Sequence, residues 1–149
     1  VLCGTIAAQA LVRDFGIAHP RLAVAALNPH AGEMGTLGDE EREIIAPAVT
    51  ALRELGIAAE GPLASDSLFH AKARGTYDAV LCMYHDQALI PLKLIAFARA
   101  VNVTVGTPLV RTSPDHRTAF HIVGRNQADA GSMKAAIRLA VQMVETRGE

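Results

Sequence analysis

The sequence has little of what several classes of protein require. Its 149 residues include no tryptophan, two cysteines and 4% aromatic residues. No apolar run reaches the length of about 18 residues that a membrane-spanning helix needs, so no membrane span is predicted. No basic stretch followed by an apolar one opens the chain, so no secretory signal is predicted. The formal net charge of −1, with both signs dispersed, leaves no basic stripe for nucleic acid.

Several motifs that define enzyme classes are also missing. There is no CxxC pair, and Cys3 and Cys82 lie far apart in apolar surroundings, which predicts two reduced, buried thiols in a cytoplasmic protein. The glycine-rich segment NPHAGEMGTLG, residues 28–38, matches neither GxGxxG nor GxxxxGK[ST], so neither a Rossmann fingerprint nor a phosphate-binding P-loop is predicted. No serine lies in a GxSxG elbow, which argues against a serine hydrolase.

What the sequence does contain is an alternation of apolar strands and amphipathic helices. Half of the residues are hydrophobic, enough for a substantial core. Apolar runs predict strands over 21–27, 57–59, 77–83 and 101–105, and 3.6-residue periodicity predicts helices over 2–15, 39–56 and 132–145. This order is typical of an α/β fold with a mostly parallel sheet and helices on both faces. We predict a single α/β unit over 1–149. Because the chain opens in mid-helix without methionine, we also predict that it is a portion of a longer protein.

Two histidines follow predicted strands at the edge where parallel sheets bind ligands. His30 lies in the loop after the strand at 21–27, and His85 lies after the strand at 77–83. Their placement is typical of a divalent-metal site, although two ordinary loop histidines would give the same pattern. Asp86 and Glu33 lie beside them, either to orient the imidazoles or as solvated carboxylates.

Three further side chains suit an anionic ligand. Lys93 follows the apolar run LIPL, Asn102 opens the strand at 101–105, and Arg111 lies in a segment of apolar and turn residues. An arginine fork and a lysine point charge are the usual partners of phosphate and carboxylate groups. We therefore predict that these residues hold a small phosphorylated or carboxylated molecule.

Five motifs occur together in a known order: NPHAGE, GPLASDSLF, MYHDQALIPLK, VNVTVG and RTSPDH. From about residue 12 onward the chain resembles the C-terminal portion of the 4-hydroxythreonine-4-phosphate dehydrogenase family of pyridoxal phosphate (vitamin B6) biosynthesis. The resemblance implies that His30 and His85 are two of three metal-binding histidines, and that Lys93, Asn102 and Arg111 bind substrate. It also implies NAD, a divalent metal (zinc, magnesium or cobalt), an isocitrate and isopropylmalate dehydrogenase-like fold of two domains, and a homodimer with an active site shared between subunits.

The implied reaction is the oxidation of 4-phosphooxy-L-threonine to a 3-oxo acid that decarboxylates to 3-amino-2-oxopropyl phosphate. Two alternatives stay open: a sister dehydrogenase acting on a phosphorylated sugar acid or a dihydrodiol carboxylate, and a non-catalytic remnant that binds metal or phosphate. The third metal histidine of the family lies upstream of Val1, and the catalytic and NAD-binding residues stay unassigned. Five positions depart from the family pattern and bear on NAD binding: Met34, Ala100, Arg117, His121 and Val123.

Overall fold

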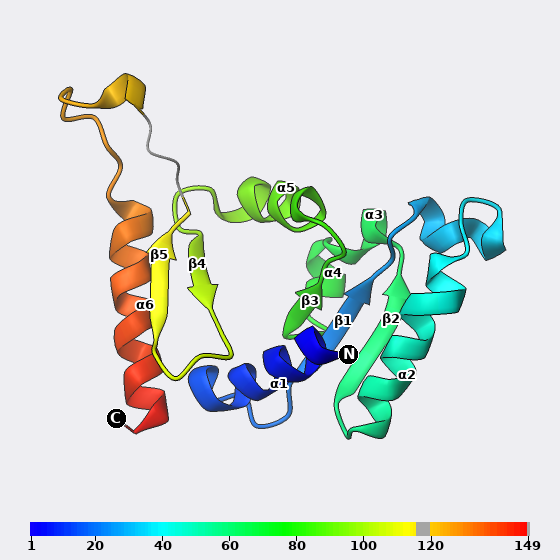
Figure 1. Ribbon diagram of the computed structural model, residues 1–149. Helices are drawn as coiled ribbons and strands as arrows, with labels where there is room; N and C mark the ends of the chain where they lie inside the picture. Colours follow the sequence, from blue (N-terminus) through cyan, green and yellow to red (C-terminus); the bar gives the residue numbers. More distant parts are fainter. Residues whose placement is uncertain (116–119, 149) are drawn as a thin grey trace.

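A parallel sheet of three strands forms the centre of the computed structural model, which describes residues 1–115 and 120–148 (Figure 1). The order is β2 (Ala58–Leu63), β1 (Arg21–Ala25) and β3 (Ala79–Leu81). Leu22 of β1 lies opposite Ala59 on one side and Ala79 on the other. The central strand is buried from residue 22 to residue 25, as expected for a parallel strand covered on both faces.

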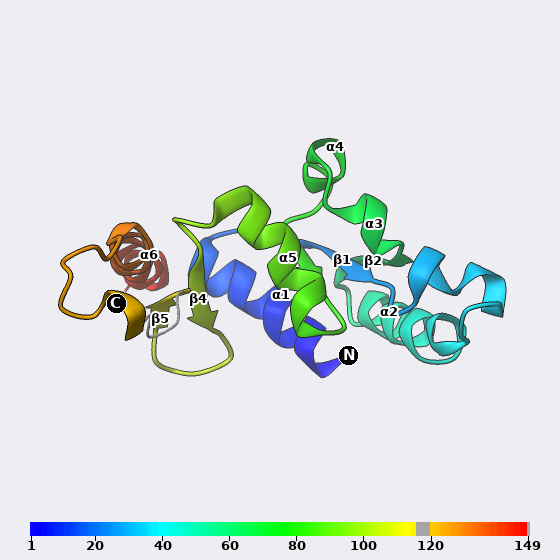
Figure 2. The same cartoon turned by 90° about the horizontal axis from the view of Figure 1, so that it is seen from above.

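Helices cover both faces of this sheet (Figure 2). On one face, α1 (Leu2–Phe15) and α2 (Ala46–Glu54) pack against β1 through the side chains of Leu22 and Val24. On the other, Ala23 and Ala25 contact Leu68 of α3 (Ser65–Leu68), and α4 (Ala71–Arg74) follows on the same side. Side chains of β1 alternate between the two layers because successive residues of a strand point to opposite faces. The predicted α/β class is thereby confirmed.

The strand predicted over 101–105 lies outside the parallel sheet. It forms β4 (Val101–Thr104), which pairs antiparallel with β5 (Arg111–Pro114) in a two-stranded ribbon. No strand was predicted at β5. The connection between the two strands is short and contains Gly106 and Pro108, too short for the crossover that a parallel partner needs. The last helix, α6 (Gly131–Arg147), packs along this ribbon and against α1.

Helix α5 (His85–Ala96) joins the sheet to the ribbon and was not predicted, because Pro91 in its interior argues against a helix. The helix predicted over 39–56 is instead a π-helix, η2 (Glu41–Ile45), continued by α2. Two short 3-10 turns, η1 (Pro29–Gly35) and η3 (Phe120–Ile122), complete the described elements. None of the helices in these parts is long and apolar enough to cross a membrane. Both cysteines are free, as predicted, but Cys3 is exposed and Cys82 is only partly buried, so the predicted burial was wrong for Cys3 and holds only in part for Cys82.

A buried ion pair ties α1 to α6. Asp14 of α1 is fully buried, and its Oδ1 accepts a hydrogen bond of 2.8 Å from Nε of Arg147. The same guanidinium donates to the carbonyl of Pro108 at 2.8 Å, so it also contacts the loop between β4 and β5. Hydrogen bonds from Arg13 and Arg147 outweigh the effect of burial and lower the pKa of Asp14 to about 2. The carboxylate is therefore charged at all but strongly acidic pH.

Candidate active site

The two predicted histidines follow β1 and β3, which are parallel neighbours in the sheet (Figure 1). The turn η1 follows β1 and carries His30, and α5 begins at His85 after β3. Both side chains are exposed. Because β1 and β3 are parallel neighbours, the loops after them leave the sheet at the same edge.

The turn that carries His30 has an uncommon backbone. His30, Ala31, Glu33 and Met34 all have φ between 43° and 55°, and Gly32 between them has φ 79°. Residues other than glycine avoid this left-handed region because Cβ crowds the following carbonyl, at about 1–2 kcal/mol per residue. Such strain persists where surrounding contacts hold the backbone, most often at functional sites.

Glu41 holds the start of this turn. Its Oε1 accepts hydrogen bonds from the backbone N–H groups of Leu27 at 2.8 Å and Asn28 at 2.7 Å. Its Oε2 accepts from Nδ2 of Asn28 at 3.0 Å, and a Cβ placed on Gly32 would come within 2.6 Å of that oxygen. Burial alone would raise the pKa of Glu41, but the hydrogen bonds from Asn28 and Leu27 outweigh it, so the pKa lies below its usual value. The carboxylate is the form that this turn requires.

The three polar residues at the start of α5 have three different surroundings. Nδ1 of His85 lies 2.8 Å from Oδ1 of Asp86, which leaves Nε2 for another partner. Gln87 turns inward and is 7% exposed. Its Oε1 accepts from the N–H of Met83 at 2.7 Å, and its Nε2 donates to the carbonyl of Ala26 at 2.6 Å and to Oγ of Ser65 at 2.8 Å. The side chain of Gln87 thus joins β1, the β3–α5 turn and α3.

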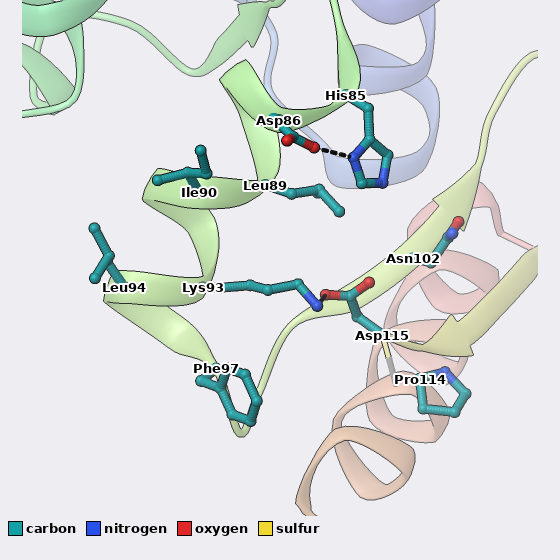
Figure 3. Close-up of a pocket in the computed structure, with 10 residues that line it drawn as sticks. All are labelled: His85, Asp86, Leu89, Ile90, Lys93, Leu94, Phe97, Asn102, Pro114 and Asp115. Carbon is teal, nitrogen blue, oxygen red and sulfur yellow. Dashed lines mark hydrogen bonds and ion pairs between the residues drawn. The ribbon is translucent and has the colours of Figure 1, made fainter. Parts of the chain in front are cut away.

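An open pocket of about 710 Å³ lies between α5 and the β4–β5 ribbon (Figure 3). His85 and Lys93 line it from α5, and Asn102 lines it from β4. Nζ of Lys93 lies 3.5 Å from Oδ2 of Asp115 and 5.7 Å from the centre of the Phe97 ring. Helix α5 contributes both polar and apolar side chains, and the ribbon contributes Asn102, Pro114 and Asp115 (Figure 3). This mixture suits a small ligand with one anionic end.

Arg111 shares a face of the ribbon with Asn102. The register pairs Asn102 with Ser113 and Thr104 with Arg111, and directly opposed residues of an antiparallel pair project to the same side. Nη1 of Arg111 donates to Oγ1 of Thr104 at 2.9 Å. Thr112, on the opposite face, donates to the carbonyl of Ala136 in α6, so the Asn102–Arg111 face points away from α6.

The structure brings together three of the five predicted site residues. Within the described part of the chain, the pocket lining includes His85, Lys93 and Asn102 but not His30 or Arg111. Of the two proposed orienting carboxylates, Asp86 contacts His85, whereas Glu33 is exposed and makes no hydrogen bond to His30 among residues 1–115 and 120–148.

The donor set fits part of a metal site. A histidine that shares one ring nitrogen with a carboxylate and keeps the other available is the usual arrangement of a metal ligand, and His85 has it. A catalytic metal normally takes three protein ligands. Among residues 1–115 and 120–148, no group of three or more His, Cys, Asp or Glu side chains gathers in a form that would hold a metal. His85 therefore has the surroundings of a metal ligand, whereas His30 lies outside the pocket that His85 lines.

Sequence reasoning missed four residues that shape the site: Glu41, Gln87, Asp115 and Ser132. Ser132 is buried, donates to the carbonyl of Ala100 at 2.6 Å and accepts from the N–H of Asp115 at 3.0 Å. It therefore holds Asp115 near Lys93. Polar residues are normally predicted to be exposed, so their burial here was not expected. Of the four, only Glu41 had a recognisable position, in the first turn of the helix predicted over 39–56.

The departures from the family pattern differ in their structural setting. Met34 is fully exposed with φ 55°, a position that glycine adopts at less cost. Ala100 is buried and is not among the residues with positive φ, so alanine carries no backbone penalty there. Arg117 lies outside the described residues, and for His121 only the backbone, within η3, is described.

Comparisons with known proteins identify the relatives of this chain. The family model described as "Pyridoxal phosphate biosynthetic protein PdxA" matches residues 2–140. The 4-hydroxythreonine-4-phosphate dehydrogenase of Caulobacter vibrioides is 63% identical over 145 residues, which is 97% of this chain and 44% of that protein. Its counterpart from Bradyrhizobium diazoefficiens is 57% identical over 142 residues, 95% of this chain and 41% of that protein.

Solved structures give the same result. The crystal structure of 4-hydroxythreonine-4-phosphate dehydrogenase from Klebsiella pneumoniae matches with a TM-score of 0.82 and 47% identity, over 94% of this chain and 42% of that one. A terephthalate 1,2-cis-dihydrodiol dehydrogenase from Burkholderia xenovorans matches with a TM-score of 0.70 and 35% identity, over 97% of this chain and 44% of that one. The fold is thus that of a family of dehydrogenases, and this chain spans less than half the length of these relatives. The chain belongs to the PdxA family.

Proposed function

We propose that the protein to which this chain belongs is an NAD-dependent, divalent-metal-dependent dehydrogenase of pyridoxal phosphate biosynthesis. Its substrate would be 4-phosphooxy-L-threonine, oxidised to a 3-oxo acid that loses carbon dioxide to give 3-amino-2-oxopropyl phosphate. The observation that carries the proposal is the pocket that brings His85, Lys93 and Asn102 together in a chain so similar to proteins of that name. This chain would be the C-terminal portion of a two-domain, cytoplasmic enzyme.

In this proposal the chain's own residues hold the two ends of the substrate. Lys93 and Asn102 bind its anionic groups from facing walls of the pocket, and Arg111 reaches the same ligand from its face of the ribbon. Lys93 exchanges its contact with Asp115 for one with the ligand. Binding energy from these remote groups orients the reacting carbon.

His30 and His85 would hold the metal, with Asp86 orienting His85. A divalent metal held there would supply Lewis-acid polarisation of the substrate hydroxyl, and NAD would supply the hydride acceptor. The remaining metal ligand would come from the rest of the protein. We also propose a homodimer whose active site uses both subunits, as the family resemblance implies.

A second candidate substrate class rests on a specific finding. The dihydrodiol dehydrogenase that matches with 35% identity carries the same fold and acts, by its name, on a carbocyclic diol. A sister activity on a dihydrodiol carboxylate or a phosphorylated sugar acid is therefore the alternative. The third alternative, a non-catalytic remnant, is opposed by the presence of all five predicted site residues.

The test is NADH formation by the full gene product. We expect turnover of 4-phosphooxy-L-threonine that stops on chelation and returns with zinc, cobalt or magnesium. His30→Ala and His85→Ala should abolish it. Turnover of only a dihydrodiol or sugar-acid substrate would support the alternative, and no turnover of any of them would favour the remnant.

A separate prediction concerns Arg111. Arg111→Ala should raise KM for the phosphorylated substrate by about 10-fold or more, because a charge-assisted contact is worth roughly 1.5–3 kcal/mol. Arg125→Ala, which removes an exposed arginine from the segment before α6, is the matched control. Unchanged KM and kcat in Arg111→Ala would reject its anchoring role.

A further inference from the structure

A carboxylate lines the pocket in which the anionic groups of the proposed substrate would bind. Asp115 directly follows β5 and faces Lys93 of α5, with its Oδ2 3.5 Å from Nζ of the lysine (Figure 3). Asn102 lines the same pocket, and its partner in the ribbon, Ser113, lies two residues before Asp115. The pocket therefore presents an anion beside a cation, whereas a purely anionic ligand calls for cations and hydrogen-bond donors.

Hydrogen bonds hold the backbone of Asp115 in this place. Its N–H donates to Oγ of Ser132 at 3.0 Å, and that hydroxyl donates to the carbonyl of Ala100 at 2.6 Å. Ser132 is 7% exposed, and the side chain of Asp115 is 20% exposed. These contacts join the end of β5 to the first turn of α6 and to the residue before β4. The carboxylate therefore stays at the pocket wall when the lysine side chain moves.

Substrate binding changes the electrostatic surroundings of this carboxylate. In the proposed function, Lys93 turns from Asp115 to an anionic group of the ligand. In the part of the chain that the structure describes, Lys93 is the only cation that pairs with Asp115, so the carboxylate would then face an anionic ligand with no opposite charge beside it. Leaving a partly buried charge unpaired is unfavourable, and a second anion nearby adds repulsion. A ligand that also brings a cation to Asp115 removes this penalty.

We propose that Asp115 is a specificity-determining residue that accepts a hydrogen bond from the 2-ammonium group of the substrate, while Lys93 contacts the adjacent carboxylate. The ammonium and carboxylate groups of an α-amino acid are bonded to the same carbon, so their opposite charges lie close together, as those of Lys93 and Asp115 do. The two side chains therefore recognise an amino-acid zwitterion as a unit. This inference rests on the proposed function, and it narrows the substrate class to molecules with a free 2-ammonium group, in place of the sugar acids and dihydrodiol carboxylates of the alternative.

The experiment measures NADH formation by the full gene product with two substrates. One is 4-phosphooxy-L-threonine, and the other is the analogue in which a hydroxyl of the same configuration replaces the 2-ammonium group. The unaltered protein should prefer the amino substrate in kcat/KM by about 10- to 100-fold, the loss expected for one charge-assisted hydrogen bond. Asp115→Asn keeps the shape of the side chain and removes its charge. It should lower kcat/KM for the amino substrate by a similar factor, mainly through KM, and leave the value for the hydroxyl analogue unchanged or higher.

Two further variants separate charge recognition from other effects. Asp129→Asn makes the same chemical change at an exposed position and keeps an acceptor for the N–H of Gly131, so the preference should equal that of the unaltered protein. Asp115→Glu keeps the charge on a longer side chain and should retain more of the preference than Asp115→Asn. If Asp115→Asn does not fold, the two substrates still test the inference in the unaltered protein, because equal values of kcat/KM there would overturn it.

The outcomes distinguish the inference from the proposed function. If the full gene product turns over 4-phosphooxy-L-threonine and Asp115→Asn keeps the preference for it, the inference alone is wrong. Equal losses for both substrates in Asp115→Asn would also overturn it, because they would show that Asp115 only positions Lys93. Turnover of neither substrate would reject the proposed function, and the inference would fall with it. A preference of the unaltered protein for the hydroxyl analogue would reject both and support the sister activity.

Discussion

Three successive residues at the start of α5 show how neighbouring polar side chains take separate roles. His85 lines the pocket, Asp86 contacts its imidazole, and Gln87 is buried. The sequence predicted the first two because histidine and carboxylate types point to metal chemistry. It did not predict the third, because the partners of Gln87 lie 61 and 22 residues away along the chain. Burial of a polar residue depends on such distant partners, which no local pattern contains.

Met34 offers a test of backbone strain at a single residue. Its side chain is fully exposed, so only its φ of 55° distinguishes it energetically. Met34→Gly removes about 1–2 kcal/mol of left-handed strain and adds about 0.5–1 kcal/mol of lost chain entropy. We expect the free energy of unfolding to rise by about 0.5–1 kcal/mol, measured by urea denaturation.

The control for this prediction is a glycine substitution at an exposed position of a right-handed helix. Gln142→Gly in α6 should lower the free energy of unfolding by about 1 kcal/mol, since glycine is a poor helix former. A loss of stability in Met34→Gly comparable to that in Gln142→Gly would show that the left-handed turn carries no strain.

At the scale of elements, the parallel sheet and its helices were predictable and the ribbon was not. Continuous apolar runs in β1 and β3 and the periodicity of α1 and α6 are local signals, and all four elements formed. The strand β5, read from sequence as loop, pairs through Arg111 and Pro114 with β4, and its proline and polar residues give no strand pattern. The helix α5 was missed because Pro91 normally interrupts a helix.

The contact between α1 and α6 depends on Asp14. Asp14→Asn would remove the charged carboxylate that Nε of Arg147, whose side chain is only 5% exposed, contacts at 2.8 Å. Breaking a buried pair in this way costs roughly 3–5 kcal/mol, so we expect a loss of that size at pH 7 in urea unfolding. Asp39→Asn removes an exposed ion pair with Arg42 and should cost less than about 1 kcal/mol.

The same pair sets a pH dependence with a definite sign. The pKa of Asp14 is lowered from 3.8 to about 2, so the charged carboxylate favours the folded state above pH 4, and its contribution disappears as the pH falls through about 2. A shift of this size corresponds to about 2 kcal/mol. The stability difference between the unaltered protein and Asp14→Asn should therefore shrink between pH 5 and pH 2. A difference independent of pH over that range would contradict the ion-pair explanation.

At the scale of the whole molecule, one face of α6 lacks a partner within the described residues. Ala136 and Met143 are buried, whereas Met133, Ile137 and Val141 are 45%, 58% and 53% exposed. These three lie four residues apart and form one apolar stripe. A two-stranded ribbon backed by one helix is also a small unit on its own. Because this chain spans 44% of its Caulobacter relative, we expect the remainder of the protein to cover the stripe.

Methionine oxidation tests this expectation without any substitution. Met143 is fully buried and Met34 fully exposed, so the two provide internal limits for the rate of sulfoxide formation by hydrogen peroxide. In the full gene product, followed by peptide mass spectrometry, Met133 should oxidise almost as slowly as Met143, because a covered thioether is inaccessible to the oxidant. In the chain of residues 1–149 alone, it should oxidise at a rate between the two limits. A rate for Met133 close to that of Met34 in the full gene product would mean that the stripe faces solvent there.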